Sequence, residues 1–163
     1  MLLALAQAAP APAASAASAA SKETWAIATA RSNDGSRVIV YRFIDDLGPR
    51  VGERASQRER ITLHWHYDVD ANNGMPPDTD KAGMDELEDL LDPVVDRDGF
   101  SNLALVTTGE GERLWIYYAR SGADFRERMT RAVRGHGPYP VDVDVAADPG
   151  WTAYEDVVST VRR

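Results

Sequence analysis

Two histidines and an aspartate occupy alternate positions in the middle of the chain, as His64-x-His66-x-Asp68. The surrounding segment 61–70 alternates between apolar and polar residues, which predicts a β-strand with one face in the core. The polar face then holds the two imidazoles next to each other. Two imidazoles with a carboxylate can bind Zn²⁺ or Fe²⁺, and imidazoles can also serve in general acid–base catalysis.

The neighbouring strands determine what else lies on this face. We expect strand 61–70 at the centre of a sheet, between strands 113–120 and 141–146. The candidate ligand face then comprises His64, His66, Asp68, Trp115, Tyr117, Asp142 and Asp144. Arg113 has the same parity and would repel a cation, and an N-terminal hairpin would cover part of the face through Trp25 and Ile27. We therefore favour a solvated or covered sheet face with no metal and no cofactor.

Hydrophobic periodicity and turn residues predict the elements around this strand. Runs 25–30 and 38–41 flank Asn33-Asp34-Gly35 and predict a hairpin, and residues 44–60 predict a solvated connection. The following elements are a helix from Asp80 to Pro93, strands 101–108 and 113–120 joined by residues 109–112, a helix after Ser121, and a strand at 141–145. Asp148 as N-cap and Pro149 as the first helical residue would open a last helix.

From residue 61 onward the order is strand, helix, strand, strand, helix, strand, which is the ferredoxin-like split βαβ arrangement. The predicted fold is therefore α+β: an antiparallel sheet with helices on one face, an added N-terminal hairpin and a C-terminal helix. We expect Leu63 and Trp65 to be buried beneath the helices that contain Leu87 and Phe125.

The composition limits the possible functions. The chain has 163 residues, a formal net charge of −8 and no cysteine, so thiolate metal sites, disulfides and cysteine nucleophiles are excluded. The acidic balance disfavours nucleic acid as a partner. No apolar run is long enough to span a membrane, and no phosphate-binding glycine loop or Gly-x-Ser-x-Gly motif occurs.

The first 21 residues contain no charge and are rich in Ala, Pro and Ser. They begin with an apolar stretch that ends in Ala-x-Ala patterns like those that signal peptidases cut. We interpret residues 1–21 as a truncated signal peptide followed by a disordered linker, and residues 22–163 as one domain. The protein would then be periplasmic or secreted; the alternative is a cytoplasmic protein with an alanine-rich tail.

Charge is segregated along the domain. Residues 68–98 contain eleven Asp or Glu against Lys81 and Arg97, whereas residues 113–134 contain six arginines against Asp124 and Glu127. The acidic region could be a docking surface for a basic partner. The interpretation that we favour is internal: an acidic helix and a basic helix face each other, with about 0–1 kcal/mol from each exposed pair.

Three segments resemble a bacterial family of unknown function, DUF695: Leu63-His64-Trp65-His66-Tyr67, residues 113–118, and residues 148–154. The resemblance covers roughly residues 23–160. The acid-rich helix and the Asp-Pro-x-Trp segment are more weakly similar to the B-type protein regulator of ribonuclease E. Family members often end in a Leu/Pro tail, whereas this chain ends in Val161-Arg162-Arg163. The resemblance implies no activity.

The sequence thus predicts a small, non-catalytic protein-binding or regulatory module with an unidentified protein partner. The alternative is a metal-binding protein or a hydrolytic enzyme that uses the face of His64 and His66. An enzyme would require that face to be open, whereas a binding module needs only a surface patch.

Overall fold

The computed structural model describes residues 23–69 and 73–162. Six strands form one sheet: β1 (Thr24–Arg31), β2 (Val38–Asp46), β3 (Glu59–His66), β4 (Ser101–Gly109), β5 (Glu112–Ala119) and β6 (Val141–Ala147). The helices are α1 (Asp78–Val95), α2 (Gly122–Ala132) and α3 (Thr152–Val161), with short 3₁₀ helices η1 (Gly48–Gly52) and η2 (Arg54–Ser56). The predicted leader, residues 1–21, lies outside the described residues.

The strand order is β1-β2-β4-β5-β3-β6, and every neighbouring pair is antiparallel. The four strands from β3 onward have the order β6-β3-β5-β4, which confirms the split βαβ arrangement and the α+β fold. The N-terminal hairpin extends the sheet because β2 pairs with β4, for instance Phe43 with Leu105. The expectation that this hairpin covers the histidine face is therefore wrong.

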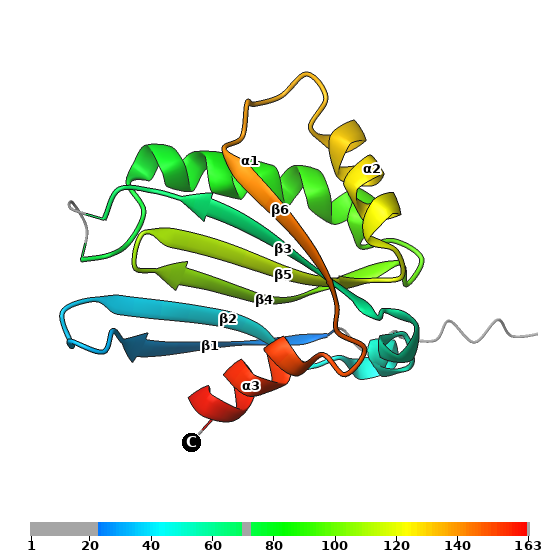
Figure 1. Ribbon diagram of the computed structural model, residues 1–163, viewed down its shortest axis with the longest axis horizontal. Coiled ribbons are helices and arrows are strands. Elements are labelled where there is room, and N and C mark those ends of the chain that lie inside the picture. Colours follow the sequence, from blue (N-terminus) through cyan, green and yellow to red (C-terminus); the bar gives the residue numbers. More distant parts are fainter. Residues whose placement is uncertain (1–22, 70–72, 163) are drawn as a thin grey trace, which may run out of the picture.

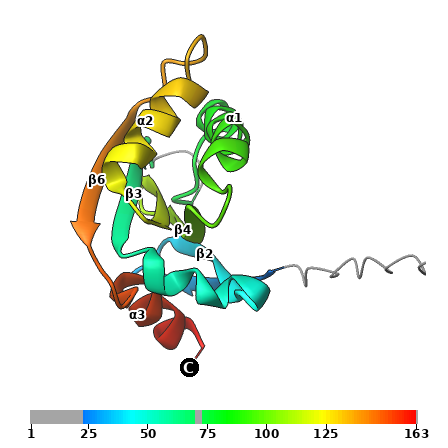
Figure 2. The same cartoon turned by 90° about the vertical axis from the view of Figure 1, so that its right-hand side faces the viewer.

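Helices cover both faces of the sheet, as Figures 1 and 2 show: α1 and α2 lie on one side and α3 on the other. The larger core lies under α1 and α2, where Leu63 and Trp65 pack in one cluster with Leu87 and Phe125, as expected. The second core lies under α3, where apolar residues of the helix, and Trp151 immediately before it, cluster with Ile116 and Tyr118. None of the helices among the described residues is long and apolar enough to span a membrane.

The register between β3 and β5 corrects the predicted histidine face. Leu63 lies opposite Trp115, Ile61 opposite Tyr117, and Trp65 opposite Arg113. Residues that pair across antiparallel strands share a face, so Trp115, Tyr117 and Arg113 lie on the α1 side and not beside the histidines. The sequence could not show this, since Leu114–Tyr118 is apolar at every position and has no alternation.

Several predicted boundaries also differ. Helix α1 begins at Asp78 and continues past Pro93 to Val95. The β4–β5 turn has two residues, Glu110 and Gly111, both with positive φ, which suits a two-residue hairpin.

The segment 44–60 is not simply solvated, because it buries Leu47 and Gln57 and contains both 3₁₀ helices. At the C-terminal end, Pro149 lies outside α3. Asp148 nevertheless caps that helix: its carboxylate accepts the N–H of Thr152 at 2.7 Å and of Ala153 at 3.1 Å.

Candidate functional site

The two histidines lie on the α3 side of β3, beyond the area that α3 covers. His64 is half-buried and His66 is exposed. Their rings stack with centroids 6.3 Å apart and planes 25° apart. The alternation of β3 therefore directs both imidazoles to the same open part of the sheet.

Glu112 is the carboxylate that completes this group. Its Oε1 lies 2.8 Å from His64 Nδ1 and 3.7 Å from His66 Nε2. One potential ligand atom from each of His64, His66 and Glu112 lies within 4.8 Å of the others. Glu112 was not predicted because its place beside His66 depends on the register between β3 and β5, which the sequence does not reveal.

The predicted aspartates contribute unequally. Asp144, on β6, has Oδ2 3.5 Å from His64 Nε2. Asp142 lies opposite His64 in the register, yet it makes no ion pair within the described part of the chain. Asp68 follows the end of β3 and is exposed. The structure thus joins His64, His66 and Asp144 of the predicted set with Glu112.

A second group of polar residues lies on the other face, between α1 and the β1–β2 hairpin. A pocket of about 340 Å³, here called the acidic pocket, is lined by Glu23, Trp25, Arg42, Glu88, Asp92, Asp96 and Leu103. An adjoining pocket of about 170 Å³ shares Arg42 and Glu88 and is more apolar, with Ile27, Val40 and Val106 in its walls. The exposed side chain of Ile27 borders it at the edge strand β1.

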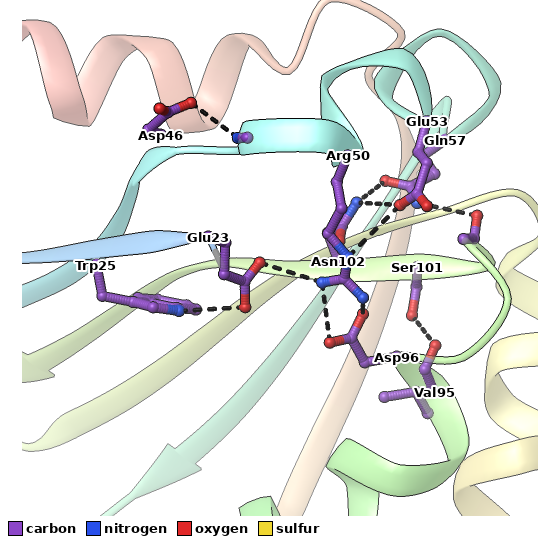
Figure 3. A network of polar contacts seen from close by, with 12 residues as sticks. Glu23, Trp25, Asp46, Arg50, Glu53, Gln57, Val95, Asp96, Ser101 and Asn102 are labelled. Atoms are coloured by element: carbon purple, nitrogen blue, oxygen red, sulfur yellow. Dashed lines mark hydrogen bonds and ion pairs between the residues drawn. The ribbon is translucent and has the colours of Figure 1, made fainter. Parts of the chain in front are cut away.

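Arginines neutralise most of the carboxylates around the acidic pocket. Arg50 Nη1 donates hydrogen bonds to Asp96 Oδ2 at 3.0 Å and to Glu23 Oε2 at 3.1 Å (Figure 3). Trp25 Nε1 donates to the same Glu23 carboxylate at 3.3 Å. Glu88 forms an ion pair with Arg42 and accepts a hydrogen bond from Trp115 Nε1 at 2.9 Å. Three carboxylates of the pocket are therefore held in place.

Asp92 is the exception. Its carboxylate has no ion pair and no hydrogen bond with any described residue. Desolvation of the carboxyl, followed by the nearby charges of Glu88 and Asp96, raises the pKa of Asp92 to about 6, although the charge of Arg42 opposes this rise. Beneath it, the buried hydroxyl of Tyr117 has no hydrogen-bond partner in the described parts of the chain. Burial, and then the carboxylates of Asp92 and Glu88, raise the pKa of Tyr117 well above its usual value.

The ion pairs also correct the favoured interpretation of the segregated charge. Helices α1 and α2 are neighbours, but two acidic side chains of α1, Asp85 and Glu88, pair with arginines of the sheet. Arg42 of β2 bonds Glu88, and Arg113 of β5 lies 3.5 Å from Asp85. Arg128 of α2 instead donates to the carbonyl of Val94 and lies over the ring of Phe100. Glu88 and Asp85 project from α1 toward β2 and β5, so the arginines of these strands lie closer to them than the arginines of α2 do.

The fold and these sites define an α+β domain with a split βαβ core, an added edge hairpin and two polar sites on opposite faces. Comparison with family models then places it: residues 23–159 match DUF695, a family of unknown function, and the chain belongs to that family. No curated protein and no solved structure gave a significant match. The comparisons do not show the weaker similarity to the regulator of ribonuclease E.

Proposed function

We propose that this protein is a non-catalytic binding module that takes a basic side chain of a partner protein into the acidic pocket. The observation that supports this most is Asp92, whose carboxylate forms no ion pair with any described residue, whereas the three other carboxylates of the pocket do. Charged groups that lose hydration without gaining a partner destabilise a fold. A Lys or Arg from outside would supply the missing charge.

The surroundings suit a peptide segment. Trp25 forms an aromatic wall over which Arg42 already lies, 5.3 Å from the ring centroid, and aromatic walls favour cations. The adjoining pocket offers apolar contact through Ile27, Val40 and Val106. Among the described strands, β1 pairs only with β2 and forms an edge of the sheet, where a partner segment can add main-chain hydrogen bonds. A basic residue flanked by apolar ones fits this combination.

Selection from a phage-displayed library of random peptides tests the proposal. We expect enriched peptides to carry Arg or Lys beside apolar residues and to bind less tightly as salt is raised. Calorimetry with the strongest peptide should show at least about tenfold weaker binding to Asp92→Asn, which corresponds to about 1.4 kcal/mol.

Asp89→Asn is the matched control because it removes the same charge from the same helix at an exposed position that lines neither pocket. It should bind the peptide like the wild type. Peptides without basic enrichment, or equal binding to Asp92→Asn and wild type, would contradict the proposal.

We also propose export, on the charge-free Ala/Pro/Ser composition and Ala-x-Ala patterns of residues 1–21. The intact mass of the protein purified from envelope and cytosolic fractions of its native host tests this. A shortened chain outside the cytosol is expected, and a cytosolic chain that still begins at Met1 would contradict export.

A further inference from the structure

We propose that His64, His66 and Glu112 form a binding site for a divalent transition-metal ion such as Zn²⁺. This proposal is independent of the acidic pocket, which lies on the other face of the sheet. It starts from the spacing of the three side chains, whose potential ligand atoms lie within 4.8 Å of one another. The three come from the paired strands β3 and β5, so the backbone already places them together.

The combination of two imidazoles and one carboxylate favours a transition-metal ion of intermediate softness. Imidazole binds Zn²⁺, Co²⁺, Ni²⁺ and Cu²⁺ well, whereas Mg²⁺ and Ca²⁺ prefer oxygen donors alone. In tetrahedral zinc sites with bonds of about 2.0–2.2 Å, ligand atoms lie about 3.3 Å apart. The widest separation, at most 4.8 Å, must therefore shorten by up to about 1.5 Å, and the 2.8 Å contact between His64 and Glu112 must lengthen by about 0.5 Å. The exposed His66, with 67 % of its side chain accessible, is free to make that movement.

The other nitrogen of His64 supports the same assignment. His64 Nδ1 points to Glu112 Oε1 at 2.8 Å. Its Nε2 is buried, has no hydrogen bond with any residue that the structure describes, and lies 3.5 Å from Asp144 Oδ2. Histidines that bind metals commonly donate their second N–H to a carboxylate, which orients the ring. Asp144 is placed for that role, and its exposed side chain can close the remaining distance.

The structure removes the objections that the sequence raised against a metal here. Arg113 lies on the opposite face, over the ring of Trp115. The hairpin that was expected to cover the histidines extends the sheet beyond β4. A third protein ligand, which the sequence did not supply, is present as Glu112.

Calorimetric titration of the untagged chain with ZnCl₂ at pH 7.5, with elemental analysis of the dialysed protein, tests the site. We expect one zinc per chain, with binding lost in His66→Ala and Glu112→Gln. Asp144→Asn should weaken binding by about tenfold or more, as loss of an orienting carboxylate does. Addition of Co²⁺ should produce visible absorption bands that disappear in His66→Ala.

His136→Ala is the matched control, because His136 lies beside Glu86 in another region, and it should bind zinc like the wild type. Circular dichroism checks that every variant is folded; His66 and Glu112 are outside both hydrophobic clusters. Absence of zinc binding to the wild-type chain would overturn the proposal. So would binding that persists unchanged in both His66→Ala and Glu112→Gln.

Discussion

Tyr118 donates its hydroxyl hydrogen to Asp148 Oδ2 at 2.8 Å, and this buried bond joins the centre of the sheet to the cap of α3. Trp151 stacks on the same tyrosine ring, with centroids 4.2 Å apart and planes 7° apart. Its indole Nε1 donates to the carbonyl of Gln57 at 2.9 Å. Asp148 and Trp151 therefore hold α3 on the sheet, and these contacts give both residue types a structural role.

Tyr117 and Tyr118 are neighbours on β5 that face opposite cores, and their hydroxyls provide a matched test. Tyr118→Phe should lower the free energy of unfolding by about 1–3 kcal/mol, because Asp148 loses a buried donor. Tyr117→Phe should leave it unchanged or raise it by up to about 1 kcal/mol, since it removes a hydroxyl that has no hydrogen-bond partner among the described residues. Urea unfolding of both variants measures the difference, and similar losses in the two would refute this assignment of partners.

Asp148 should make the free energy of unfolding depend on pH in the acidic range. Although burial opposes it, the backbone N–H groups of Thr152 and Ala153 hold the pKa of Asp148 below its usual value. The stability that this carboxylate contributes is therefore present above the unfolded pKa of about 4 and is lost as pH falls through the lower folded value.

Asp148→Asn should accordingly be less stable than the wild type at pH 7, with a difference that shrinks below about pH 4. Thermal unfolding between pH 2 and pH 7 follows this difference. A constant difference over the whole range would mean that the charge of Asp148 is unimportant.

Trp65 connects β3 to α1. Its side chain is 4 % exposed, and Nε1 donates to Asp80 at 2.9 Å. Trp65→Ala should cost about 3–5 kcal/mol, a large part of the roughly 5–15 kcal/mol that such domains have. Trp65→Phe should cost less, and Trp25→Ala, at a partly exposed position, serves as a control. Urea midpoints give the comparison, and an unchanged midpoint in Trp65→Ala would show that this strand face is not the core.

The split βαβ order could be predicted because alternation marks β3 and β6 and a helical stripe marks α1. The burial of Leu63 and Trp65 followed from the same alternation. The registers between strands could not be predicted, because β5 is apolar on both faces and offers no parity. For that reason Trp115 and Tyr117 were expected beside the histidines, and Glu112 was overlooked.

The acidic pocket lay beyond sequence reasoning for a different reason. The acid-rich helix was evident, but its partners Arg42, Arg50 and Arg113 come from distant segments that the fold brings together. Pairing was therefore expected between helices, where charges of opposite sign were most concentrated along the chain. Asp92 could be distinguished from its acidic neighbours only after their partners were known.

Asp92 should destabilise the folded protein at neutral pH, and its removal should reveal this. The pKa of Asp92 is about 6 in the folded chain, above the usual value of about 4 in an unfolded chain. The folded state therefore binds the proton more tightly, so stability falls as pH rises from about 4 to about 6 and is constant above that.

Asp92→Asn removes this dependence. The variant should be more stable than wild type at pH 7 by about 1 kcal/mol. This is less than the free energy that corresponds to the whole pKa shift of Asp92, because water screens the charge of this exposed side chain. Near pH 4 the two proteins should have the same stability. Urea unfolding at both pH values measures the change, with Asp89→Asn as the control expected to stay within about 0.5 kcal/mol of wild type. If Asp92→Asn is less stable than wild type at pH 7, the Asp92 carboxylate already has a stabilising partner in the folded protein and needs none from outside.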